Sequence, residues 1–374
     1  MKFVCDRKIL LDAINTVSKA VSSKATVSAL EGILLYSYMS DESSGLRLTG
    51  YDLEIGIETT IEADVSELGA VVVNSRQLGD IVRKGADSNI YFSCDDKMLI
   101  TIKCGTSTHE ILGISSEDFP QLPEFSEDKR IEADQQLLKK MIKQTLYAVS
   151  QNMQRPILTG AKFILNDGKL VVVSSDAYRL AVAKTEEEKL KSFGDIDFVV
   201  PGKTLNELLK IFDDMEKTIK IGISQKHIMF VIDNVMVVSR LLAGEFLNYE
   251  NSIPQDCIIK AKVNVRQFID SIERVSLLIN EKMSSHIKLN IDDESIELTC
   301  TTAIGRANDE VLISSEGGKM EIGFSHRYLL DALHACETDE VIFQLKSPLS
   351  PAIIMPEEGD AFIHLVVPVR MREK

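Results

Sequence analysis

A short strand followed by a capped helix occurs three times in this chain, at residues 2–22, 130–150 and 260–280. Each copy opens its helix with Asp6, Asp134 or Asn264, residue types whose side chains accept hydrogen bonds from first-turn amides. Apolar residues then recur every three or four positions, as on one face of a helix. A unit that recurs in this way predicts one small domain used three times.

A second helix is expected later in each third. A basic residue lies near its start and a leucine follows two positions on; these pairs are Arg76 and Leu78, Lys203 and Leu205, and Arg327 and Leu329. Short runs rich in β-branched residues and separated by turn residues predict hairpin strands around these helices. We therefore expect an α+β protein of three tandem domains, each with two helices packed on antiparallel sheets. The expected boundaries are 1–124, 125–254 and 255–374.

The net charge, the apolar runs and the cysteine pattern limit the classes of function that the chain can have. The net charge is −15 and the pI is about 5.0, which taken alone argues against a nucleic-acid partner. The sequence contains no apolar run long enough for a membrane span and no signal peptide, so we expect a cytoplasmic protein with no membrane partner. The six cysteines form no C-x-x-C pair. In a reducing compartment they are expected to be buried apolar residues, with no metal and no cofactor.

Motifs for catalysis are absent from the sequence. There is no G-x-x-x-x-G-K-[ST] loop and no G-x-G-x-x-G segment, the patterns that cradle phosphates. Ser175 and Asp176 allow a hydrolase as a weak alternative, but they lack the G-x-S-x-G elbow and a nearby histidine. We expect no enzyme activity.

Cations gather on several expected helices, although the whole chain is acidic. They are Arg7, Lys8, Lys19 and Lys24 on the first helix, Arg76, Arg83 and Lys84 on the second, and Lys139, Lys140 and Lys143 on the third. Basic residues on one helix would only indicate a solvated surface. Their recurrence on several helices indicates that a polyanion binds along the surface that these helices share. The chain has no Trp, so contacts to phosphates without sequence reading are favoured over base stacking.

Five segments resemble, in order and spacing, the bacterial sliding-clamp family, the β-subunits of DNA polymerase III. They are TGYDLE at 49–54, DFP at 118–120, SDAYRLA at 175–181, NEK at 280–282 and VPVRM at 367–371. The resemblance implies a head-to-tail homodimer closed as a ring around duplex DNA, with helices facing the hole. It also implies a non-catalytic processivity factor. The replicative polymerase, the clamp loader and repair proteins would bind it through short peptide motifs.

The resemblance also implies three sets of site residues. The DNA-contacting set is Lys24, Arg76, Asn152, Arg155 and Lys203. The peptide pocket is Leu158, Ser175, Ala177, Tyr178, Arg179, Leu180, Leu247, Ile253, Val367, Pro368, Val369, Arg370 and Met371. The subunit seam joins Leu78, Ile81, His109 and Ile111 of one chain to Leu277 and Leu278 of the other.

Several positions depart from the family pattern. Ala177-Tyr178 replaces a common Gly-His pair, Leu247 a frequent Pro, Met371 the usual Leu and Lys24 an Arg. A second hypothesis remains open at this stage, a platform of the same repeats that binds peptides but not DNA. Retention on circular but not on linear DNA separates the two hypotheses.

Overall fold

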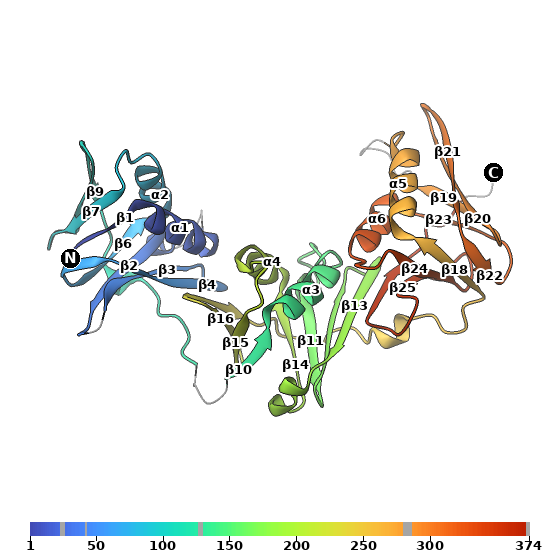
Figure 1. Ribbon diagram of the computed structural model, residues 1–374, viewed down its shortest axis with the longest axis horizontal. Helices are drawn as coiled ribbons and strands as arrows, with labels where there is room; N and C mark the ends of the chain where they lie inside the picture. Colours follow the sequence, from blue (N-terminus) through green and yellow to red (C-terminus); the bar gives the residue numbers. More distant parts are fainter. Residues whose placement is uncertain (23–26, 42, 126–129, 280–285, 372–374) are drawn as a thin grey trace. The chain divides into compact units, whose positions relative to one another are not determined.

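The computed structural model describes residues 1–22, 27–41, 43–125, 130–279 and 286–371. Over this part of the chain each third contributes two α-helices. They are α1 (Arg7–Val17) and α2 (Ser75–Arg83), α3 (Gln135–Leu146) and α4 (Gly202–Ile211), and α5 (Val265–Ser276) and α6 (His326–His334) (Figure 1). The three expected pairs of helices are therefore present.

The described strands pair antiparallel in four sheets. Two sheets belong to one compact unit, Met1–Gln136 with Lys210–Leu241. The first runs β5 (Asp64–Glu67), β1 (Lys2–Asp6), β7 (Asn89–Cys94), β8 (Leu99–Cys104) and β9 (Ser107–Leu112). The second runs β10 (Arg130–Asp134), β15 (Thr218–Ile223), β16 (His227–Ile232), β17 (Val235–Arg240), β4 (Ile55–Glu62), β3 (Ser44–Tyr51), β2 (Gly32–Met39) and β6 (Gly69–Asn74).

The other compact unit is Leu137–Leu209 with Leu242–Lys374. Its larger sheet runs β14 (Ile196–Pro201), β11 (Gly160–Asn166), β12 (Lys169–Ser175), β13 (Arg179–Glu186), β26 (Phe362–Val366), β25 (Ala352–Met355), β24 (Glu340–Leu345), β18 (Ile259–Asn264) and β22 (Ser314–Glu316). Its smaller sheet runs β21 (Gly305–Leu312), β20 (Ser295–Thr302), β19 (Ile287–Ile291) and β23 (Met320–Phe324).

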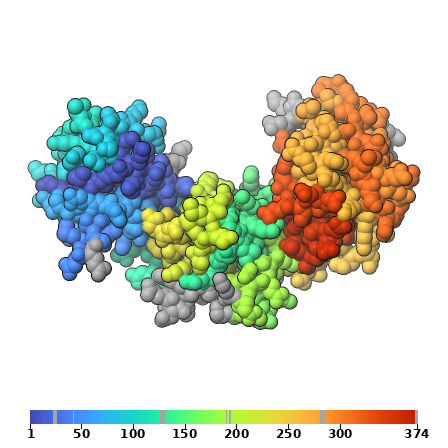
Figure 2. Space-filling model, in the orientation of Figure 1, coloured from blue at the N-terminus to red at the C-terminus, as the bar shows by residue number. Residues whose placement is uncertain are grey.

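The middle third of the sequence is divided between the two units because its strands pair in both directions. Strand β17 pairs with β4 of the first third, with Val237 opposite Ile57. In Figure 2 the yellow residues around 210–241 lie directly against the blue first third. Strand β13 pairs with β26 of the last third, with Val182 opposite Ile363. Sheets therefore run across the expected boundaries between repeats.

Asp6 and Asn264 cap their helices as the sequence pattern predicts. Asp6 Oδ1 accepts from the backbone N–H groups of Lys8 (2.8 Å) and Ile9 (3.0 Å) at the start of α1. Asn264 Oδ1 accepts from the Gln267 N–H (3.0 Å) at the start of α5. Each bond satisfies an amide that has no partner within the helix, which fixes where the helix begins.

The recurring leucine of the second helix has the same structural role in each third. Leu78, Leu205 and Leu329 are all buried. In the first third α1 and α2 lie side by side (Figure 1), and a Cβ placed on Gly79 would be only 3.6 Å from the Ile14 methyl. In the last third Phe268 of α5 packs edge-to-face on Phe343 of β24, with ring centroids 5.8 Å apart. The core is thus built from helix pairs packed on sheets, and the polar faces of the helices are exposed to solvent.

Candidate functional site

Two basic residues of the expected DNA-contacting set lie in the first turns of helices. Arg76 and Lys203 are the second residues of α2 and α4, and both are exposed. Arg76 also borders a hollow of about 540 Å³ between α1 and α2. Ser18 and Ser75 line the hollow, and their hydroxyls form a hydrogen bond of 2.8 Å. Lys24 is outside the described residues.

Asn152 and Arg155 lie in the connection after α3. The Asn152 carboxamide oxygen accepts from the Gln154 N–H (2.9 Å), and the Leu158 N–H donates to the Arg155 carbonyl (3.0 Å). Both side chains are exposed. These bonds fold the connection into a turn that presents one amide and one guanidinium next to Leu158.

A pocket of about 450 Å³ brings part of the DNA-contacting set together with part of the peptide-binding set. Its lining is Ser150, Gln151, Asn152, Gln154, Arg155, Leu158, Asp176, Ala177, Tyr178 and Tyr328. Polar groups of the 150–155 connection therefore face an aromatic wall made by Tyr178 and Tyr328, whose rings stack with centroids 6.0 Å apart.

Four of the expected pocket residues share one apolar cluster. Leu158 and Leu180 are buried in it, and Leu247 and Ile253 pack against it half-buried. Leu158 also lines the pocket, so these four expected residues converge in space although they lie between positions 158 and 253 of the sequence.

The segment 367–371 lies beside this cluster. The Val367 N–H donates to the Tyr178 carbonyl (2.9 Å), and the Val369 N–H donates to the Gly323 carbonyl (2.8 Å). A Cβ on Gly323 would lie 3.0 Å from Met371 Cγ, so the two residues are in close contact. Pro368 is half-buried and Arg370 is exposed. Val367, at 37% exposed, and Val369, at 36%, present apolar surface on this segment.

The Ser175 hydroxyl forms hydrogen bonds within its own turn. It donates to the Arg179 carbonyl (2.9 Å) and accepts from the Ala177 N–H (3.2 Å), and the side chain is buried. The hydroxyl therefore shapes the loop that carries Tyr178, and the hydrolase alternative has no support from this geometry.

Arg179 is held by charge and by aromatic rings. Its Nε donates to Asp176 Oδ2 (3.0 Å) and its Nη1 donates to Asp331 Oδ2. Its guanidinium carbon lies 4.7 Å from the Tyr328 ring centroid and 5.3 Å from that of Tyr147. Burial lowers the pKa of Arg179, but the Asp331 hydrogen bond and the Asp176 charge outweigh it, so the net pKa is raised. Arg179 is thus a fixed cation.

Among the expected seam residues Leu78 is only 1% exposed and packs in the core of its own repeat. Ile81 and Ile111 are half-buried, and His109 is exposed on β9. Leu278 is half-buried, and Leu277, 82% exposed, follows α5.

Sequence reasoning missed three further exposed apolar residues near these positions. Leu112 ends β9, Leu312 ends β21, and Ile304 immediately precedes β21; all three are about three-quarters exposed. Strands β9 and β21 are the edges of their sheets among the described strands. A large apolar residue at the end of an edge strand was the available signal, but β21 was not foreseen.

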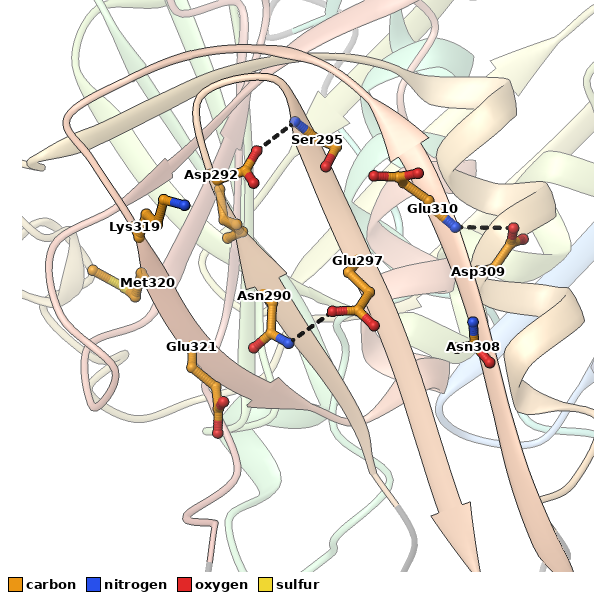
Figure 3. Close-up of a pocket in the computed structure, with 11 residues that line it drawn as sticks. Asn290, Asp292, Ser295, Glu297, Asn308, Asp309, Glu310, Lys319, Met320 and Glu321 are labelled. Carbon is orange, nitrogen blue, oxygen red and sulfur yellow. Dashed lines mark hydrogen bonds between the residues drawn. The ribbon is translucent and has the colours of Figure 1, made fainter.

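A separate hollow of about 750 Å³ lies on the sheet β21-β20-β19-β23 (Figure 3). Glu321, Asn290, Glu297 and Glu310 stand opposite one another on its four strands. The Asn290 amide donates to Glu297 (3.1 Å). No His, Cys, Asp or Glu group among the described residues is arranged to hold a metal ion. This hollow is therefore an acidic strand surface.

None of the described helices is long and apolar enough to cross a bilayer. Three repeats, each with two helices, and antiparallel sheets that join the middle repeat to the first and to the last define the DNA-clamp class of proteins. The chain belongs to the DNA polymerase III beta subunit family. Its residues 1–123, 132–248 and 250–370 match the N-terminal, central and C-terminal domains of that family.

Known proteins agree with this assignment along the whole chain. The beta sliding clamp of Halalkalibacterium halodurans is 33% identical over 99% of this chain and 100% of its own length. The DNA polymerase sliding clamp of Bacillus subtilis is 31% identical over 100% of both chains, with a TM-score of 0.95. The sliding clamp of Pseudomonas aeruginosa bound to griselimycin is 26% identical over 99% of this chain and 100% of its own, with a TM-score of 0.91. The chain functions as a DNA sliding clamp, a non-catalytic processivity factor whose partners are DNA and the polymerase.

Proposed function

We propose that two copies of this chain join head to tail into a ring around duplex DNA. The observation that carries the proposal is the pair of sheet edges, β9 in the first third and β21 in the last, each ending in an exposed leucine. An edge strand offers unpaired backbone groups to another chain. Because the two edges differ, their contact is heterologous, and such contacts close into a ring when the rotation suits.

In this ring the three repeats, taken as 1–124, 125–254 and 255–374, occur twice. Leu112, Ile111, His109 and Ile81 of one chain would meet Leu312, Ile304, Leu277 and Leu278 of the next. Arg76, Asn152, Arg155, Lys203 and Lys24 would contact phosphates. The exposed positions of the four described members support this role, because phosphate contacts need no base reading.

The apolar pocket would receive short peptide motifs of the replicative polymerase, the clamp loader and repair proteins, and also griselimycin. Its support is the convergence of Leu158, Leu180, Leu247 and Ile253 beside Tyr178. Apolar clefts with a few fixed polar groups are the usual form of such sites.

Retention on DNA tests the ring. The protein is loaded onto a nicked circular plasmid by a clamp loader, and the bound fraction is measured before and after a single restriction cut. Topological linkage predicts that the clamp stays on the circle at raised salt and leaves after the cut. Equal retention on both forms, or a strict monomer in sedimentation at micromolar concentration, would contradict the ring.

A further inference from the structure

The wall of the peptide pocket is anchored from another repeat. Tyr178 lines the pocket, and its position depends on the turn between β12 and β13. In that turn Asp176 Oδ1 accepts from the Tyr178 N–H (2.9 Å) and from the Arg179 N–H (3.0 Å). Tyr178 and Arg179 are therefore set by the same carboxylate.

Helix α6 reaches this turn with two side chains of the last repeat. Tyr328 stacks on Tyr178 and also lies against the Arg179 guanidinium. Asp331, one helical turn further along α6, receives the Arg179 Nη1 hydrogen bond. Residues three apart on a helix share a face, so both side chains engage the same guanidinium.

The Arg179 guanidinium therefore makes its interactions with other groups of the protein. Its side chain is 13% exposed and lies between two carboxylates and two rings. A planar guanidinium combines fork-like hydrogen bonding with stacking, which a lysine cannot reproduce. Asp331 itself is 46% exposed at the side chain and is not among the described residues that line the pocket.

We propose that Asp331 is a positioning residue of the peptide pocket, which fixes Arg179 and through it the Tyr178 wall. The inference rests on the proposed peptide-binding function and deepens it. It makes ligand affinity depend on a contact between the second and third repeats that lies outside the pocket. It also assigns Arg179 to shaping the pocket, so that the pocket favours neutral and apolar ligand groups.

The test is the affinity for griselimycin, measured by isothermal titration calorimetry on the full-length protein. Asp331→Asn removes the charge and leaves the size unchanged, and we expect binding to weaken about tenfold because a charge-assisted hydrogen bond is lost. Asp331→Glu restores a carboxylate and should recover most of the affinity. Asp339→Asn makes the same charge change at an exposed position of the same repeat and should bind as the parent does.

A double-mutant cycle shows whether Asp331 acts through Arg179. Coupled residues are non-additive, so Asp331→Asn should have little further effect in an Arg179→Lys background. Melting curves of all variants are recorded, and similar midpoints exclude loss of fold. If the parent binds griselimycin and Asp331→Asn binds equally well, or if the two changes are additive, the positioning role is overturned. If the parent itself does not bind, the proposed pocket fails and this inference fails with it.

Discussion

Leu53 and Ala177 adopt the same left-handed backbone conformation, with φ of 73° and 75°, at the same turn of the first and second repeats. Each follows an aspartate, Asp52 or Asp176, whose Oδ1 accepts from the second and third N–H groups beyond it. The aspartate bonds compensate for a conformation that residues with a Cβ adopt at a cost. The loop of the pocket is therefore an inherited feature of the repeat.

Ala177→Gly should stabilise the protein by about 1 kcal/mol, because glycine adopts positive φ without the Cβ penalty. The free energy of unfolding in urea is the measurement. Ala181→Gly, a buried position of β13, provides the control and should destabilise. A loss of stability in Ala177→Gly would show that the methyl group makes a contact worth more than the strain.

His364 should make stability depend on pH. It is fully buried on β26, neither ring nitrogen has a hydrogen-bond partner among the described residues, and burial lowers its pKa from 6.5 to about 3. Between these values the unfolded chain binds a proton that the folded chain does not. Stability is therefore complete above pH 6.5 and falls below it, by up to about 1.4 kcal/mol per pH unit.

His364→Phe should remove this dependence, since phenylalanine fits a ring site between Phe362 and Tyr147. Urea unfolding at several values from pH 4 to 8 measures the difference from the parent. His334→Phe changes an exposed histidine and should keep the parent's slope. Parallel curves for the parent and His364→Phe would mean that the pKa of His364 is the same in the folded and the unfolded chain.

Leu277→Lys should dissociate the proposed dimer. The side chain is 82% exposed, so the change costs the single chain little stability but places a charge in the seam. Sedimentation velocity should show a monomer where the parent is a dimer. Met215→Lys, at a 65% exposed position, should stay dimeric. A dimeric Leu277→Lys protein would place the seam elsewhere.

Lys203→Ser should weaken DNA binding and its salt dependence together. Removing one phosphate contact reduces the slope of log K against log salt by about 1. Fluorescence anisotropy with a labelled duplex at several salt concentrations gives this slope. Lys226→Ser, in the exposed turn between β15 and β16, is the control. An unchanged slope for Lys203→Ser would remove this residue from the DNA-contacting set.

Local chemistry made much of the fold predictable. Asp6 and Asn264 start their helices because a side-chain oxygen replaces a missing backbone partner, and this depends only on nearby residues. Strand β21 (GRANDEVL) was missed because its polar residues follow no alternation, and only pairing with β20 defines it. Strand β13 was not predicted as an element, because Arg179 and Leu180 were interpreted mainly as pocket residues, with a core-strand role for Leu180 as the alternative.

The resemblance predicted candidate members of the site, but it did not predict the contacts that these residues make. Resemblance named Leu158 and Tyr178, and the structure places both at one pocket. The burial of Leu78 and the engagement of Arg179 by Asp331 depend on which helix packs where. Such long-range relationships leave no periodic trace in the sequence.

The β17–β4 and β13–β26 ladders have a consequence for any attempt to divide the molecule. A repeat excised at its sequence boundaries would lose the partner strand of one of these ladders. Its newly exposed strand edge, with unpaired amide and carbonyl groups, would then promote aggregation into fibres.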